Sequence, residues 1–166
     1  PRAARLEEID APEPAEDEAL LKVSHCGVCG SDLHAWLDHP GYEFVLPEVT
    51  FGHEVSGIVE RIGSDVTQWN LGDHAVMVAV QTAHDDNCRY CREGSPQLST
   101  RRRVQGLSLD GGMAEYICVK EEFLVPAPPD LALHLASLTE PLSVADHCVV
   151  DRSPIEKESK VVVTGP

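Results

Sequence analysis

The stretch GHEVSGIVERIG (residues 52–63) joins a predicted strand to two ionisable side chains. Residues 55–62 alternate apolar and polar side chains, as expected for a strand with one buried face. His53 and Glu54 stand directly before this strand, in a segment rich in glycine. An imidazole beside a carboxylate can bind a metal or move a proton. The stretch therefore predicts a β domain that carries its chemistry where a strand begins.

Three further segments show the same alternation: residues 18–24, 74–80 and 113–119. Gly or Asp-Gly turn residues bound several of these segments, and the chain contains 12 Gly and 12 Pro but only 5% aromatic residues. Short strands at this spacing with such turns favour a small, irregular β-barrel or sandwich. Residues 83–106 show no apolar period and concentrate charge, so we expect them to form a separate lobe.

The pattern changes to helical spacing from Leu131, with Asp130 as the expected N-cap and Pro141 starting a second helix through Val150. Residues 151–160 are polar, and residues 160–164 predict a short apolar strand that runs into Gly165. A strand that meets a glycine is how a dinucleotide-binding βαβ unit opens. We therefore divide the chain into residues 1–150 and residues 151–166, with Gly165 as a candidate cofactor contact.

Acidic residues dominate the charge of the chain: 28 Asp and Glu face 13 Lys and Arg, giving a formal net charge of −15. Such a charge repels phosphate backbones, so nucleic-acid binding is not expected. It also suits a high-salt cytoplasm, although an ordinary acidic enzyme explains it equally well. No apolar run approaches the roughly 20 residues of a membrane span, and no signal peptide is visible. We expect a cytoplasmic protein without membrane partners.

The stretch CGVCGSDLH (residues 26–34) places a thiol, a hydroxyl, a carboxylate and an imidazole close together. Catalytic zinc takes three protein ligands from Cys, His and Asp or Glu and keeps one open position. Cys29, His53 and an acid meet that requirement. Asp32 could orient His53 through its other ring nitrogen, and Ser31 with His34 could pass a proton outward.

The six cysteines include two Cys-x-x-Cys pairs, Cys26 with Cys29 and Cys88 with Cys91. In a cytosolic chain this spacing indicates metal or redox chemistry more than disulfides. Both pairs could instead form one four-thiolate zinc site in a binding module without catalysis. Cys118 and Cys148 lie inside apolar stretches and are expected to be small buried side chains.

Several motifs together resemble the zinc-dependent medium-chain dehydrogenases, the superfamily of alcohol and polyol dehydrogenases. They are, in order, CGVCGSDLH at 26–34, GHEVSGIVERIG at 52–63, Gly-Asp at 72–73, DGGMAEY at 110–116 and TEPLSVADH at 139–147. The resemblance covers nearly the whole chain. It implies a mainly β, GroES-like barrel as the catalytic domain, with short helices, leading into a Rossmann domain that is missing or truncated here.

The resemblance also implies roles for single residues. The zinc ligands would be Cys29, rather than Cys26, together with His53 and an acid. Glu54 is one candidate acid, and Glu140 is the other, because the polyol and threonine dehydrogenase branches carry a glutamate at that position. The lobe departs from the family's four-cysteine spacing, since Asp85 and Ser99 occupy two of the four positions. We therefore expect no structural zinc in the lobe.

The implied function is a zinc- and NAD- or NADP-dependent oxidoreductase that oxidises a secondary alcohol, such as a polyol or sugar. Catalysis would form a zinc alkoxide and transfer hydride to the nicotinamide, with Ser31, His34 and Glu140 as catalytic residues. The substrate would be a small alcohol, and the full-length protein a dimer or tetramer. The alternatives are a catalytically incomplete GroES-like fragment and the non-catalytic zinc module.

Overall fold

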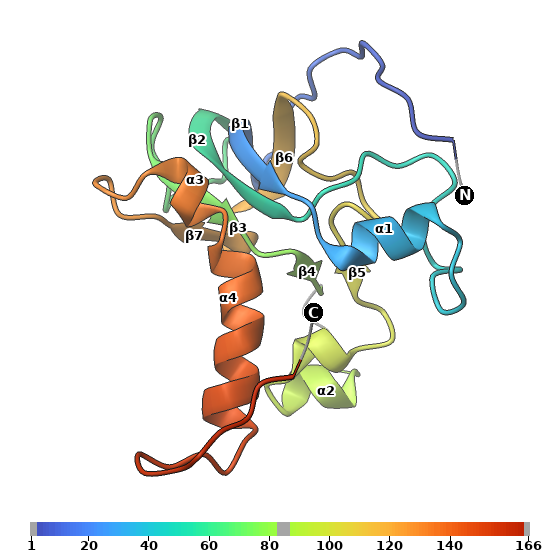
Figure 1. Cartoon of the computed structure of the whole chain (residues 1–166). Coiled ribbons are helices and arrows are strands. Elements are labelled where there is room, and N and C mark those ends of the chain that lie inside the picture. The colour runs from blue at the N-terminus through green and yellow to red at the C-terminus, as the bar shows by residue number, and fades with distance from the viewer. Residues whose placement is uncertain (1–2, 83–86, 165–166) are drawn as a thin grey trace.

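The computed structural model describes residues 3–82 and 87–164, and its main feature is an antiparallel sheet of five strands (Figure 1). The strand order is β6-β1-β2-β3-β7. The bounds of these strands are β1 Glu18–Gly27, β2 Glu54–Ile62, β3 His74–Met77, β6 Tyr116–Lys120 and β7 Leu124–Pro126. The mainly β fold expected from the alternating segments is confirmed.

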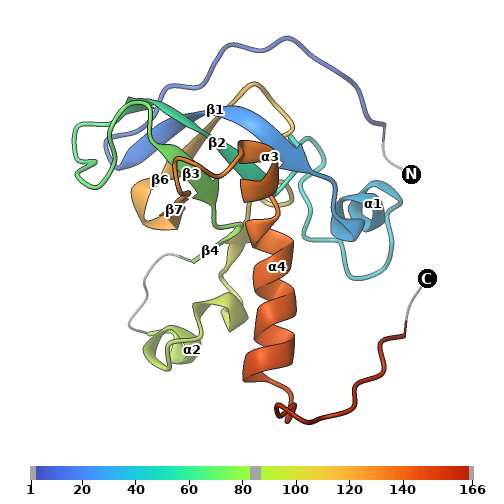
Figure 2. The ribbon, with the colours of Figure 1, turned by 60° about the vertical axis from the view of Figure 1, so that its left-hand side comes forward.

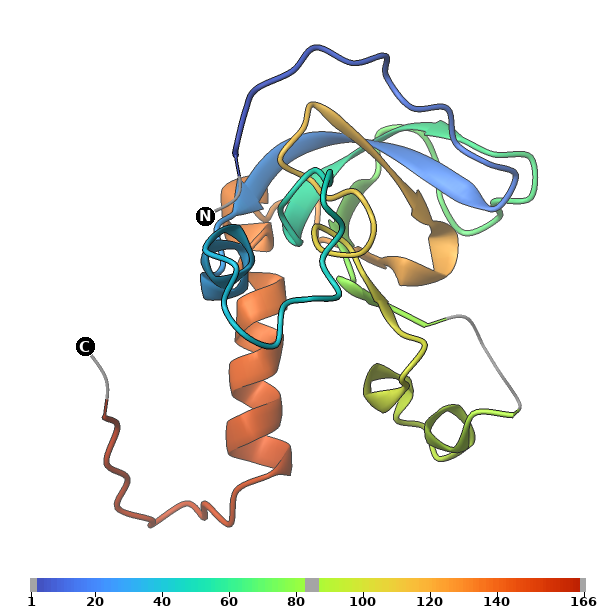
Figure 3. The same cartoon turned by 90° about the vertical axis from the view of Figure 1, so that its right-hand side faces the viewer.

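The sheet is strongly curved, because its two edge strands follow each other in the chain. Only the 3₁₀ turn η2, Glu121–Phe123, separates β6 from β7. A turn this short can join opposite edges only when the sheet curls and brings them together, as Figure 3 shows. Two register shifts between β1 and β2 add to the bend, since bulges increase local twist. The result is the barrel-like domain predicted for this sequence.

The core fills the inside of the curled sheet. Ala19 and Leu21 on β1 and Val55 and Val59 on β2 are at most 1% exposed, as the period-two pattern predicts. Other members of this core come from the remaining strands and the loop before β3: Val66, Trp69, Ala75, Met77, Ile117, Val119 and Leu124. The core fixes the ends of β1 and β2, where the candidate site lies.

The lobe predicted for residues 83–106 is joined to the rest of the chain by a two-stranded sheet. In this sheet β4, Val80–Gln81, pairs with β5, Arg103–Val104, which belongs to the lobe. Its described part carries the helix α2, Arg89–Arg92, and the 3₁₀ turn η1, Pro96–Leu98. The single strand predicted for residues 74–80 is divided into β3 and β4, because the Val78 N–H donates to the carbonyl of Phe123 and the chain then changes sheets. Figure 3 shows the lobe away from the barrel.

The helices differ from the predicted boundaries. α1 spans Gly30–Trp36 and follows the first cysteine pair. α3 spans Leu133–Ala136 with Ala132 as its N-cap, so Asp130 is not the cap; Asp130 lies in a turn closed by the Leu131 N–H and the Pro128 carbonyl. Among the described residues, no helix is long and apolar enough to cross a bilayer.

The second predicted helix begins two residues earlier than expected. α4 spans Thr139–Asp146, and Pro141 fits in its first turn because N–H groups there lack helical acceptors. A π-helical turn, His147–Asp151, continues α4 away from the sheet (Figure 2). Cys148 on this turn is exposed, contrary to the expectation of a buried side chain.

The strand predicted for residues 160–164 does not form in the described structure. A strand needs a hydrogen-bonded partner, and the two described sheets contain only strands that end by Pro126. Gly165, the candidate cofactor contact, lies outside the described residues.

Candidate metal centre

The register between β1 and β2 places the candidate ligands together. Gly27 at the end of β1 pairs with Glu54 at the start of β2. Cys29 follows Gly27 by two residues, immediately before α1, and His53 precedes Glu54 by one. Because the strands are antiparallel, both chain segments leave the sheet at the same end. The thiol and the imidazole therefore meet beside the carboxylate.

Cys29, His53 and Glu54 form a compact cluster. One ligand atom from each residue lies within 4.8 Å of the others. His53 is 5% exposed and Glu54 is 9% exposed, while Cys29 is half-buried. Within residues 3–82 and 87–164, this is the one group of three or more such side chains close enough to share a metal ion. The structure thus assembles three of the four predicted ligands.

Asp32 connects two of these residues from inside α1. Its Oδ2 accepts the backbone N–H of Cys29 at 2.9 Å, and its Oδ1 lies 3.4 Å from His53 Nδ1. This second contact is within ion-pair distance, but neither buried atom has a partner with hydrogen-bond geometry in the described structure. Burial alone would lower the pKa of His53. The effects of Asp32 and Cys29 outweigh burial and raise this pKa to about 9. A metal binding here must displace that proton.

Ser31 and His34, the predicted proton-relay pair, have different neighbours. Ser31 Oγ lies 3.3 Å from His53 Nε2, so Ser31 belongs to the cluster. His34 is exposed, and its Nδ1 lies 2.6 Å from Nδ1 of His39. The described contacts therefore do not link Ser31 to His34.

Glu140, the fourth predicted ligand, lies in the first turn of α4 and outside the compact cluster. Its pKa is raised because burial disfavours the carboxylate; the charge on His53 lowers it, whereas Glu54 and Asp32 raise it further. Ser56 on β2 positions the helices nearby by donating from Oγ to the carbonyl of Leu133 at 2.6 Å. Glu140 is thus electrostatically coupled to the centre without contacting all three ligands.

Gly27 is a site residue that the sequence analysis missed. A Cβ at Gly27 would collide with the carboxylate of Glu54, so only glycine leaves that carboxylate its present place. Gly52 performs a similar role on the other side: its φ is +97°, and a Cβ there would meet the Cys26 sulfur and Met113. In the sequence, this position is marked only by a glycine that stands directly after Cys26. Its purpose is visible only once the register with Glu54 is known.

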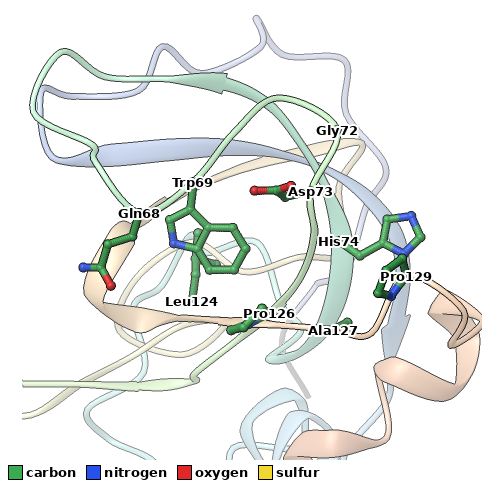
Figure 4. Close-up of a pocket in the computed structure, with 9 residues that line it drawn as sticks. All are labelled: Gln68, Trp69, Gly72, Asp73, His74, Leu124, Pro126, Ala127 and Pro129. Carbon is green, nitrogen blue, oxygen red and sulfur yellow. The ribbon is translucent and has the colours of Figure 1, made fainter.

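A pocket of about 460 Å³ lies between α4 and the strands β3 and β4. Glu140 and Thr139 line it together with apolar side chains such as Met77, Val80 and Val144. A second pocket, of about 470 Å³, contains none of the cluster residues and lies beside Trp69, Asp73 and His74 (Figure 4). Neither pocket is lined by Cys29, His53 or Glu54, but the first contains Glu140, the fourth predicted ligand.

The two cysteine pairs do not come together. Cys26 packs against the barrel core, whereas Cys88 hydrogen-bonds through its Sγ to Ser99 Oγ at 3.4 Å in the lobe. Within the described chain, no group of three or more metal-ligating side chains contains Cys88 or Cys91. The structure therefore gives no support to the four-thiolate module. Asp85, the other substituted position of the lobe, lies outside the described residues.

The chain belongs to the alcohol dehydrogenase GroES-like domain family, which its residues 15–129 match. It is 36% identical to the (R,R)-butanediol dehydrogenase of Saccharomyces cerevisiae over 94% of this chain and 47% of that protein. It is also 36% identical to the sorbitol dehydrogenase of Halalkalibacterium halodurans, over 97% of this chain and 46% of that enzyme. The resemblance to alcohol and polyol dehydrogenases is confirmed.

A solved structure shares the fold. It is a protein from Sinorhizobium meliloti 1021, assigned as a zinc-binding dehydrogenase and bound to NADP, with a TM-score of 0.82 and 34% identity. The match covers 89% of this chain and 42% of that protein. The chain thus spans about half the length of the curated relatives it matches.

Proposed function

We propose that these residues form the zinc-binding catalytic half of an NAD(P)-dependent oxidoreductase that acts on secondary alcohols of the polyol or sugar class. The cluster of Cys29, His53 and Glu54 carries the proposal. Zinc ligands lie about 2.0–2.3 Å from the metal, so ligand atoms within 4.8 Å of one another need only a small contraction around an ion. A thiolate, an imidazole and a carboxylate are also the donor types of catalytic zinc sites.

The surrounding residues fit the same ion. Asp32 Oδ1 faces His53 Nδ1, which leaves Nε2 as the metal-binding nitrogen. Asp32 Oδ1, which has no hydrogen-bond partner in the described structure, would accept the Nδ1 hydrogen of His53 while Nε2 binds the metal. The carboxylate of Glu140 is held close by, and we propose that it either replaces or assists Glu54.

Zinc bound here would supply Lewis-acid chemistry, lowering the pKa of a substrate hydroxyl. The chain's own residues would do the rest. Ser31, whose Oγ lies beside His53, would accept the hydroxyl proton and hand it toward solvent. For His34 to receive that proton, its imidazole must turn away from His39. The apolar walls of the pocket beside Glu140 would hold the carbon skeleton and exclude water.

The relatives support the substrate class: two of them are named for butanediol and sorbitol, and both substrates are alcohols with several hydroxyl groups. The related structure bound to NADP supports the cofactor class. In residues 3–82 and 87–164 the sheets are antiparallel and include no dinucleotide-binding βαβ unit. We therefore propose metal binding for these residues and turnover for the longer protein.

Elemental analysis of zinc in purified variants tests the proposal. The wild-type chain should retain one zinc, and Cys29→Ser or His53→Ala should abolish stoichiometric binding, because each removes one of about three protein ligands. Cys26→Ser and the double variant Cys88→Ser/Cys91→Ser are matched controls that should keep the metal. Thermal melts establish that each variant is folded. Zinc retained after Cys29→Ser and His53→Ala, but lost after Cys88→Ser, would support the four-thiolate module instead.

A further inference from the structure

The second cysteine pair has a geometry of its own in the lobe. Cys88 is the N-cap of α2, and Cys91 is the third residue of that helix. Residues three apart on a helix are neighbours, with Cβ atoms about 5–6 Å apart, and a disulfide needs a Cβ separation of about 3.5–4.5 Å. Because Cys88 has an extended backbone, with φ −84° and ψ 118°, a local adjustment of the cap can close this gap.

The Cys88 sulfur already has three hydrogen-bonding neighbours. Its thiol contacts Ser99 Oγ at 3.4 Å, and Ser99 is only 1% exposed. The contact with Ser99 lowers the pKa of Cys88 most, followed by the backbone N–H and the thiol of Cys91. With a smaller effect of the Tyr90 backbone they bring the pKa to about 7, although desolvation raises it. The Cys88 sulfur is therefore stabilised as a thiolate, and Cys91 is among the groups that lower its pKa.

The lobe is also the basic part of an acidic chain. The lobe, residues 83–106, contains five arginines and three acidic residues, Asp85, Asp86 and Glu93, in a protein with 28 acidic residues overall. Positive surroundings stabilise thiolates and attract anionic reactants. By contrast, burial raises the pKa of both Cys26 and Cys118 to about 11. The pKa of Cys88 is therefore lowered, whereas the pKa values of the barrel thiols Cys26 and Cys118 are raised.

We propose that Cys88 and Cys91 form a reversible disulfide by exchange with an anionic low-molecular-weight disulfide. Cys91, which is half-buried whereas Cys88 is 9% exposed, meets the reagent first. The Cys91 thiol loses its proton to solvent, and its sulfur then attacks one reagent sulfur, which forms a mixed disulfide and releases one thiol. The Cys88 thiolate then attacks the Cys91 sulfur and releases the second thiol. Two protein thiols are oxidised, and one reagent disulfide is reduced to two thiols.

The proposed disulfide has a structural consequence close to the proposed site. Closing it removes the hydrogen bond between Cys88 and Ser99, and Ser99 directly follows η1. Gln97 in η1 lines the pocket that also contains Glu140. Oxidation of the lobe would therefore alter one wall of that pocket. The disulfide itself does not depend on the function proposed above.

Incubation of the whole chain with glutathione disulfide tests this inference. Trypsin cleaves after Arg89, so a Cys88–Cys91 bond joins two peptides that are otherwise separate, and mass spectrometry of an unreduced digest identifies the link. We expect the linked peptides in the wild type, their loss after dithiothreitol, and a closing step, from the Cys91 adduct to the linked peptides, whose rate rises with pH through about 7. Cys148→Ser, which removes an exposed thiol elsewhere, is the matched control and should oxidise like the wild type.

Three variants sharpen the test. Cys88→Ser should trap a glutathione adduct at Cys91, because the second attack is lost, and Cys91→Ser should yield no linked peptides. Ser99→Ala should slow closure about five- to tenfold at neutral pH, since fewer Cys88 sulfurs are ionised. The inference would be overturned if excess glutathione disulfide modified Cys148 and left the pair reduced. Zinc bound by the pair in the wild type would overturn it as well.

Discussion

The chain contains the same four-residue cysteine spacing twice, with two different surroundings. Cys26 lies near the end of β1 and Cys29 follows that strand by two residues, so the sheet fixes both: Cys26 packs against the core, and Cys29 meets His53 and Glu54 at the start of β2. Cys88 and Cys91 stand on a helix of four residues outside the five-stranded sheet, where Ser99 and the cysteines themselves are the main partners. Spacing alone therefore does not decide between metal and thiol chemistry; the neighbouring elements do.

The largest difference between the barrel and the lobe should appear in the free energy of unfolding. Leu21→Ala on β1 should lower the free energy of unfolding by about 2–5 kcal/mol, because Leu21 is 0% exposed in the core and its loss leaves a cavity. Leu98→Ala in the lobe should cost no more than about 0.5 kcal/mol, because Leu98 is 50% exposed. Urea unfolding of both variants measures the contrast. Equal losses would mean that lobe and barrel share one core.

The next difference concerns the metal centre and rests on the proposed function. Gly27→Ala places a methyl group against the Glu54 carboxylate and should weaken zinc binding about tenfold or more. Gly30→Ala, three residues away, meets nothing within 4 Å and should leave the affinity unchanged. Competition with a chelator measures both values. Unchanged affinity in Gly27→Ala would show that Glu54 is not a ligand and would favour Glu140.

The alternation of side chains was enough to predict β1 and β2, because a curled sheet with one buried face imposes that period. The same reasoning failed where tertiary partners decide the boundary. Residues 74–80 look continuous, yet Val78 bonds to Phe123 and the strand divides there. A sequence pattern cannot show which distant carbonyl captures a given N–H.

The candidate site could likewise be predicted only in part, because contacts between distant residues decide its geometry. Cys29 and His53 could be paired from residue type, but their meeting depends on the register that places Gly27 opposite Glu54. The role of Gly27 was therefore invisible in the sequence. Likewise, Ser31 and His34 are close in sequence, but α1 turns His34 toward His39 and leaves Ser31 beside His53. Contacts across the fold decided each of these points.

The smallest effect we predict is a response to salt. Most of the 28 acidic residues lie outside the basic lobe, so the barrel and its flanking segments repel themselves at a net charge of −15. Salt also weakens attractive surface pairs such as Arg61 with Glu13 and Lys120 with Asp17. Exposed pairs contribute little, about 0–1 kcal/mol each, so the relief of repulsion should dominate and the melting temperature should rise toward molar KCl.

The lobe offers the control for this salt effect. Reversing charge there with Arg101→Glu and Arg103→Glu makes the net charge of the chain more negative and removes the attraction between the basic lobe and the acidic barrel. The rise of the melting temperature with KCl should therefore become steeper than in the wild type. Thermal melts of both proteins at low and molar KCl measure the two slopes. A melting temperature that stays flat or falls with KCl in the wild type would show that the surface pairs outweigh the self-repulsion. An equal slope in the variant would show that the lobe unfolds independently of the barrel, which would separate the two cysteine pairs thermodynamically as well as chemically.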